Sequence, residues 1–90
     1  MDENRARQVT DLLRARGIDA RMAKAGVYQF GIKVMLPDRR EAIWDTDGTA
    51  GLEAQVMRHG VLVGFVPHID GSESYDVAGV VDAIVRTDYD

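Results

Sequence analysis

The sequence contains no cysteine and only two prolines among its 90 residues. Without cysteine, a disulfide-linked scaffold and a cysteine-ligated zinc site are both excluded. No apolar run approaches the roughly 20 residues that a membrane-spanning helix needs, and the first residues are polar, unlike a signal peptide. These absences favour a cytoplasmic protein that makes no contact with a membrane.

The chain nevertheless holds enough hydrophobic residues for a core. Leu, Ile, Val and Phe make up about a quarter of it, whereas chains with less than roughly one-fifth tend to be disordered. A domain of this size buries only about 60% of its unfolded surface, so we expect one small domain over residues 1–90. The preference for Arg over Lys, with abundant Ala, Gly and Val, is typical of a GC-rich bacterial genome.

Three segments have the apolar spacing of a helix. The first covers residues 4–16, with Gly17 as its C-terminal stop. The last covers about 74–87, where Ser72 or Ser74 is a suitable N-cap. A short helix over about 49–59 is predicted from Leu52 and Val56, with Asp47 or Thr49 as N-cap and Gly60 as its end. The apolar faces of the first and last helices consist of Ala6, Val9, Leu12 and Leu13, and of Val77, Val80, Val81, Ile84 and Val85.

Four segments read as strands. A short strand over 18–23 and a long one over 27–36 alternate apolar and polar residues, with a turn at Lys24-Ala25-Gly26 between them. Pro37-Asp38 supplies the next turn, and Glu41–Asp45 returns as the third strand. Val61–Val66 is apolar on both faces, which predicts a central strand covered on both sides, with Phe30 and Phe65 in the core.

The predicted fold is therefore α+β: a two-layer sandwich of order α-β-β-β-α-β-α. Its sheet is mainly antiparallel, and the terminal helices pack on one face.

Four polar residues could carry chemistry if the fold brings them together: Asp45, Asp47, His68 and Asp70. A calcium loop aligned on Gly48 would place Ile43 and Ala54 at its first and last ligand positions, where oxygen ligands are needed. Members of a hydrolytic triad normally come from separate elements, whereas His68, Asp70 and Ser72 share one loop. Turn and cap chemistry accounts for both segments. We therefore predict no catalytic residue, cofactor or metal ligand.

The distribution of charge argues against nucleic acid as a partner. Residues 1–40 carry a net charge of +4 and residues 41–90 a net charge of −8. The order helix–three strands–helix resembles that of double-stranded-RNA-binding domains, whose final helix offers a lysine cluster to phosphate. Here the final helix carries Asp76, Asp82 and Asp88 beside Arg86. The charge gradient is also what two mutually attracting ends of one domain would give.

The second face of the sheet is the remaining candidate for function. If the 27–36 strand turns Phe30, Ile32 and Val34 to the helices, its other residues face away, and the 61–66 strand adds apolar side chains there. The sequence leaves open whether the 49–59 helix covers this face. The candidate interaction surface consists of Val27, Met35, Trp44, Leu62 and Val66.

We therefore expect a non-enzymatic protein-interaction or oligomerisation module of a bacterial cytoplasm, which associates with a protein partner or forms a homodimer through its sheet. The alternative is a small ligand- or metal-binding protein, or a minor enzyme, that uses Asp45, Asp47, His68 and Asp70.

Overall fold

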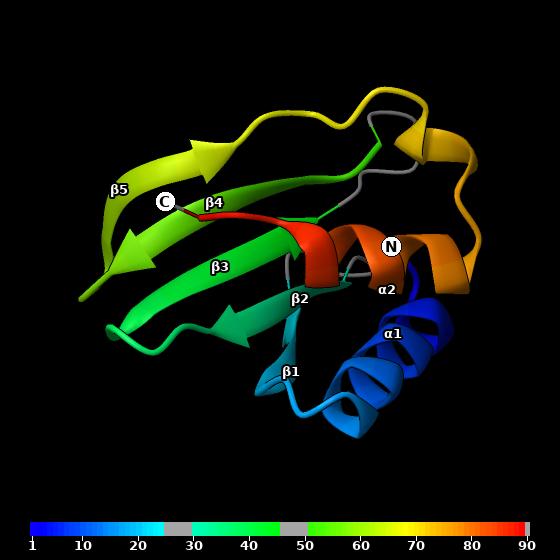
Figure 1. The fold of residues 1–90 in the computed structure, drawn as a ribbon, viewed down its shortest axis with the longest axis horizontal. Coiled ribbons are helices and arrows are strands. Elements are labelled where there is room, and N and C mark those ends of the chain that lie inside the picture. The colour runs from blue at the N-terminus through cyan, green and yellow to red at the C-terminus, as the bar shows by residue number, and fades with distance from the viewer. Residues whose placement is uncertain (25–29, 46–50, 90) are drawn as a thin grey trace.

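A computed structural model describes residues 1–24, 30–45 and 51–89 of the chain. Within these ranges, five antiparallel strands form one sheet in chain order, and two helices form a second layer against one face (Figure 1). This confirms the α+β class and the positions of the terminal helices. The elements are α1 (Glu3–Ala15), β1 (Ala20–Lys24), β2 (Phe30–Met35), β3 (Arg40–Asp45), β4 (Glu53–Arg58), β5 (Val61–Val66), the 3-10 turn η1 (Ser72–Ser74) and α2 (Val77–Arg86).

Helix α1 begins and ends as its sequence predicts. The Asp2 carboxylate caps it by accepting a hydrogen bond from the Arg5 backbone N–H at 2.8 Å. At its other end Gly17 has a φ of +81°, and the N–H groups of Gly17 and Ile18 donate to the carbonyls of Arg14 and Leu13. This pattern of two bonds is a Schellman motif, which requires a left-handed residue at the glycine position.

Helix α2 starts at a different cap from the predicted one. Asp76, and neither Ser72 nor Ser74, accepts the capping bond, from the Gly79 N–H at 2.8 Å. The two serines instead lie in η1, before the helix. The apolar stripe is as expected, with Val80, Val81 and Ile84 all buried.

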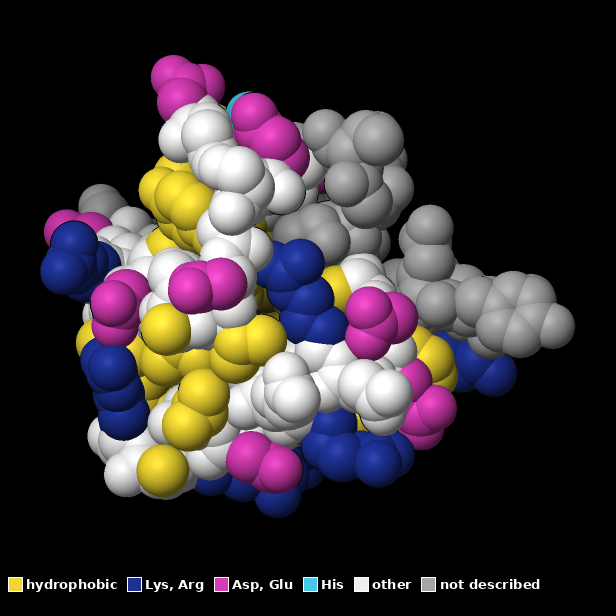
Figure 2. Space-filling view, turned by 90° about the vertical axis from the view of Figure 1, so that its right-hand side faces the viewer, with side chains coloured by type: hydrophobic (Ala, Val, Ile, Leu, Met, Phe, Trp, Pro, Cys, Tyr) yellow, Lys and Arg dark blue, Asp and Glu magenta, His cyan; other side chains and the backbone are white. Residues whose placement is uncertain are grey.

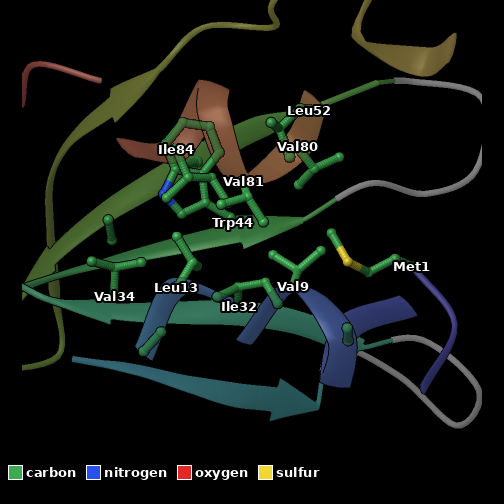
Figure 3. Packing of buried hydrophobic residues seen from close by; sticks show 14 residues of the cluster. Met1, Val9, Leu13, Ile32, Val34, Trp44, Leu52, Val80, Val81 and Ile84 are labelled. Carbon is green, nitrogen blue, oxygen red and sulfur yellow. The ribbon is translucent and has the colours of Figure 1, made fainter. Parts of the chain in front are cut away.

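The core lies between the helices and one face of the sheet (Figure 3). Trp44 is fully buried near its middle, between Ile32 on β2 and Ala54 on β4, which are its register partners. Leu13 and Val9 pack on this face from α1. Phe30 is partly buried against the same cluster, in agreement with its predicted place in the core.

The predicted helix over 49–59 is wrong for its described part, which forms strand β4. Along Glu53–Arg58 exposed and buried residues alternate, as in a strand with one buried face. His59 and Gly60 have positive φ angles of 53° and 78°, and Arg58 pairs with Val61. Two positive φ values in a two-residue loop are the requirement of a type I′ hairpin turn. The chain thus has the order α-β-β-β-β-β-α.

The prediction of a covered central strand at 61–66 is also wrong. Strand β5 is the last strand of the sheet and pairs only with β4 in the described part of the chain. Val61, Leu62, Val63 and Phe65 are each more than half exposed, and Phe65 reaches 69%. The cause is the insertion of β4: it takes the position next to β3 and displaces β5 beyond the reach of the helices (Figure 1).

Some predictions concern residues outside the described ranges. These are the turn at Ala25-Gly26, the apolar residues Val27 and Tyr28, and the caps Asp47 and Thr49. Neither helix of the described chain is long and apolar enough to cross a membrane.

Candidate interaction surface

Strand β5 presents an uncharged, apolar edge. Its sequence from Val61 to Val66 contains no charged residue and no proline. An edge strand exposes backbone N–H and C=O groups that can pair with another chain, and natural edges are commonly blocked by Lys, Pro or a bulge. Between Arg58 and Asp70 no lysine, arginine or carboxylate interrupts this segment. Neither a charged side chain nor a proline within β5 therefore opposes pairing with another chain.

An irregularity in the β4–β5 ladder places two large side chains of β5 on one face. Leu62 pairs with Met57 and Phe65 with Gln55, with a register shift between Val56 and Met57. Met57 and Gln55 are two positions apart and share a face, so their partners Leu62 and Phe65 share it too, although these are three positions apart. This is the face opposite the helices. There the two side chains and Ile43 line a hollow of about 420 Å³.

The other face of β5 is covered only at its margin. The chain after α2 returns across the helix-side face, where Tyr89 and Asp88 border a smaller hollow of about 240 Å³ beside Val63 and Gly64. The Trp44 indole Nε1 donates a hydrogen bond to the Tyr89 hydroxyl at 2.9 Å, and the two rings meet edge to face. Burial raises the pKa of the Tyr89 phenol, while the hydrogen bond from Trp44 opposes that shift.

The four described residues of the predicted interaction surface do not share one face of the sheet. Leu62 is exposed on the outer face, and Met35 lies on the same face, half-buried, opposite Glu41. Val66 pairs with Ala54 on the helix side and is partly buried. Trp44 is completely buried beneath the helices and offers no surface. Val27 lies outside the described residues.

Sequence reasoning missed the residues that dominate the exposed apolar surface. Phe65 was predicted in the core, and Val61 and Val63 were predicted to be covered, but all three are exposed. The signal that was available is Gly60, a residue suited to a tight turn, between an alternating segment over 53–58 and an apolar one over 61–66. A hairpin there makes 61–66 the last strand.

The loop after β5 holds the other candidate residues. His68 Nδ1 lies 4.0 Å from an Asp70 carboxylate oxygen, and His68 Nε2 lies 3.7 Å from a Glu73 carboxylate oxygen. The buried Ser72 hydroxyl accepts from the Leu52 N–H at 2.7 Å and donates to the Ile69 carbonyl at 2.6 Å. These two bonds fix the loop against the start of β4 and leave the hydroxyl no proton to give to His68.

The described residues contain no group of three His, Asp or Glu side chains that could hold a metal ion. The structure brings His68 and Asp70 near each other. The Asp45 side chain and all of Asp47 lie outside what it describes.

The side of the molecule where both helices begin carries mixed side chains. Figure 2 looks at this side, where acidic, basic and hydrophobic side chains lie next to one another. Asp2 and Asp76 are already used as helix caps, and the Arg5 guanidinium donates to the Tyr75 carbonyl. These groups stabilise the two helix starts.

Comparison with protein-family models, with curated proteins and with solved structures finds no match for this chain.

Proposed function

We propose that the chain is a non-enzymatic protein-interaction module of a bacterial cytoplasm, and that strand β5 is the element through which it associates. The single observation that carries this proposal is the exposure of β5: Val61, Leu62, Val63 and Phe65 are 53–69% exposed on an uncharged sheet edge. Pairing with a further strand would satisfy the free backbone groups and remove these side chains from water.

The free-energy cost of leaving this apolar surface in water supports the same proposal. Exposed hydrocarbon costs about 25 cal/mol per Å², and large side chains gathered on one strand concentrate that cost. Isolated exposed leucines or valines are ordinary on protein surfaces, whereas contiguous apolar patches mark interaction sites. Leu12 and Val85 are exposed on the two helices, but to a smaller extent than the residues of β5.

The alternative of a small ligand- or metal-binding protein or minor enzyme receives less support. It needs Asp45, Asp47, His68 and Asp70 to converge, and His68 has Asp70 and Glu73 as its carboxylate neighbours in the described loop. Ser72 carries the hydroxyl closest in sequence to His68. That hydroxyl already makes two hydrogen bonds, with the Leu52 N–H and the Ile69 carbonyl.

Site-specific photo-crosslinking tests the proposal. Phe65 is replaced by benzoylphenylalanine in one variant and Leu12 in a second, and both are irradiated in the organism that encodes the chain. Leu12 is a matched control because it is a large apolar residue, 45% exposed, on the helix layer. We expect a discrete protein adduct from position 65 and none from position 12. The absence of an adduct at position 65, or equal adducts from both positions, would show that β5 is not the interaction element.

A further inference from the structure

We infer that the occupant of the β5 edge is a second copy of this chain, whose β5 pairs antiparallel with the first to make one continuous sheet. This inference rests on the proposed function and adds the identity and orientation of the partner. It follows from three properties of the β4–β5 hairpin: the charge at its two ends, the face on which its large side chains lie, and the absence of charged residues and proline from β5.

The charges at the two ends of the hairpin distinguish antiparallel from parallel pairing of the two β5 strands. Between residues 53 and 70 the only Asp, Glu, Lys and Arg residues are Glu53, Arg58 and Asp70. Arg58 lies at the turn end of the hairpin, opposite Val61, while Glu53 lies at its open end, next to the Ala54–Val66 pair. The Ile69 N–H donates to the Leu52 carbonyl, so the chain after β5 continues along that open end towards Asp70. One end is thus positive and the other negative.

In an antiparallel arrangement the turn end of each copy lies beside the open end of the other. Arg58 of one copy then lies at the same end of the pair as Asp70 of the second, and the same juxtaposition recurs by symmetry. A parallel arrangement would place the two positive ends together and the two negative ends together. Charge complementarity therefore selects the antiparallel pair.

The outer-face side chains of β5 also match those of a second copy. A two-fold axis perpendicular to the sheet keeps the two outer faces on the same side, so outer-face residues meet outer-face residues. Leu62 and Phe65 share this face because of the register shift in the β4–β5 ladder. With Leu62 of one copy opposite Phe65 of the other, four large apolar side chains form one cluster across the junction, and no charge within β5 opposes it.

The strength of the pair can be bracketed. Each copy contributes Phe65 and a few aliphatic side chains. An aromatic side chain buries roughly 150–250 Å² when it is fully covered. Such an interface falls at the small end of specific interfaces, below about 1,200 Å² in total, where association is weak or transient. We therefore expect a reversible dimer with a dissociation constant in the micromolar range or above.

Sedimentation equilibrium of the purified chain tests for the second copy. The mass should rise with concentration from 9.9 kDa towards twice that value. Phe65→Lys, which places a charge on the edge, should raise the dissociation constant at least tenfold without lowering the melting temperature, because Phe65 is exposed. Leu12→Lys, the control on α1, should behave like the parent chain. A mass that stays at 9.9 kDa into the millimolar range, or equal effects of the two lysines, would overturn the inference.

Charge reversal tests the orientation. Arg58→Glu should weaken the dimer roughly threefold to tenfold, since attraction between oppositely charged ends is lost at two places, and adding Asp70→Arg to it should restore the parent affinity. If the double variant is as weak as or weaker than Arg58→Glu alone, the antiparallel arrangement is wrong.

Failure of this inference differs from failure of the proposed function. A purified chain that stays monomeric while position 65 crosslinks to a protein of another mass overturns the second copy and leaves the β5 edge as the interaction element. A monomeric chain with no adduct at position 65 overturns both.

Discussion

At the scale of single residues, the free energy of folding is concentrated in side chains between the helices and the sheet. Leu13, Ile32 and Trp44 have no exposed surface (Figure 3). On β5, by contrast, residues of the same chemical type face water and contribute little to the stability of the single chain. The hydrophobic content of a segment therefore does not measure its importance for folding here.

Leu13 and Leu62 provide a matched pair that tests this difference. Leu13 is fully buried on α1, whereas Leu62 is 55% exposed on β5. Leu13→Ala should lower the free energy of unfolding by about 2–5 kcal/mol, because it removes buried methyl groups and leaves a cavity. Leu62→Ala should lower it by less than about 1 kcal/mol, because its atoms are largely in water already. Urea unfolding at low protein concentration measures both values, and similar losses would contradict the assignment of β5 to the edge.

At the scale of elements, local signals predicted both helices and four of the five described strands, with only β4 read as a helix. The spacing of apolar residues and Gly17 located α1, which runs from Glu3 to Ala15 where residues 4–16 were expected. The alternation over 27–36 located β2, whose described part is Phe30–Met35. Each of these elements buries one face, and the resulting periodicity of apolar residues can be recognised from the sequence alone.

The type of β4 and the covering of β5 were mispredicted because these segments lack this kind of periodicity or have it in ambiguous form. Leu52, just before β4, and Val56 within it are four residues apart, a spacing that places two residues on one face of a helix and also on one face of a strand. In β5, apolar residues occupy every position except Gly64, so nothing in its pattern shows which face is covered. Only the position of β5 in the sheet order explains its exposure, and that depends on β4 being a strand. The candidate surface was misplaced for the same reason.

Two glycines of the β4–β5 hairpin, Gly60 and Gly64, test whether its turn depends on a left-handed backbone conformation. Gly60 has a φ of +78°, and a Cβ built on it would meet nothing within 4 Å, so the cost of Gly60→Ala is conformational alone. We expect that substitution to destabilise the chain by about 1–2 kcal/mol. Gly64 lies in β5, where a Cβ would make only an ordinary contact with Val56 at 4.0 Å. Gly64→Ala should be neutral or stabilising by up to about 1 kcal/mol.

Thermal unfolding of the two alanine variants measures these effects. If Gly64→Ala proves as harmful as Gly60→Ala, the left-handed turn at His59-Gly60 does not define the hairpin.

At the scale of the whole molecule, the basic first half and the acidic second half of the chain lie against each other. The Arg16 guanidinium contacts the Asp82 carboxylate at 3.0 Å and so joins α1 to α2. The Arg40 guanidinium donates to the Tyr89 carbonyl at 3.1 Å and so joins β3 to the segment after α2. The first contact is half-exposed and weak by itself. The charge gradient thus fits attraction between two parts of one domain, as the sequence allowed.

Tyr89 also joins the segment after α2 to the core through its hydrogen bond with Trp44. This contact makes the free energy of unfolding depend on pH at high pH. Because burial raises the pKa of the Tyr89 phenol above its ordinary value of 10.0, the folded chain holds this proton more tightly than the unfolded chain. The contribution to stability is complete below pH 10 and is lost as the pH rises through the higher folded-state pKa. Ionisation in place would put a charge beside the buried Trp44.

Tyr89→Phe should remove this dependence. At neutral pH the variant should lose about 1–3 kcal/mol, because the Trp44 Nε1 is left without its acceptor. Above pH 10 the stability of the parent chain should fall faster than that of the variant, so the difference between them narrows. Urea unfolding followed by the fluorescence of Trp44, the only tryptophan, measures both curves, and Tyr75→Phe serves as the control. A difference that stays constant across pH 10, or one that Tyr75→Phe reproduces, would mean that the phenol of Tyr89 does not couple the end of the chain to the core.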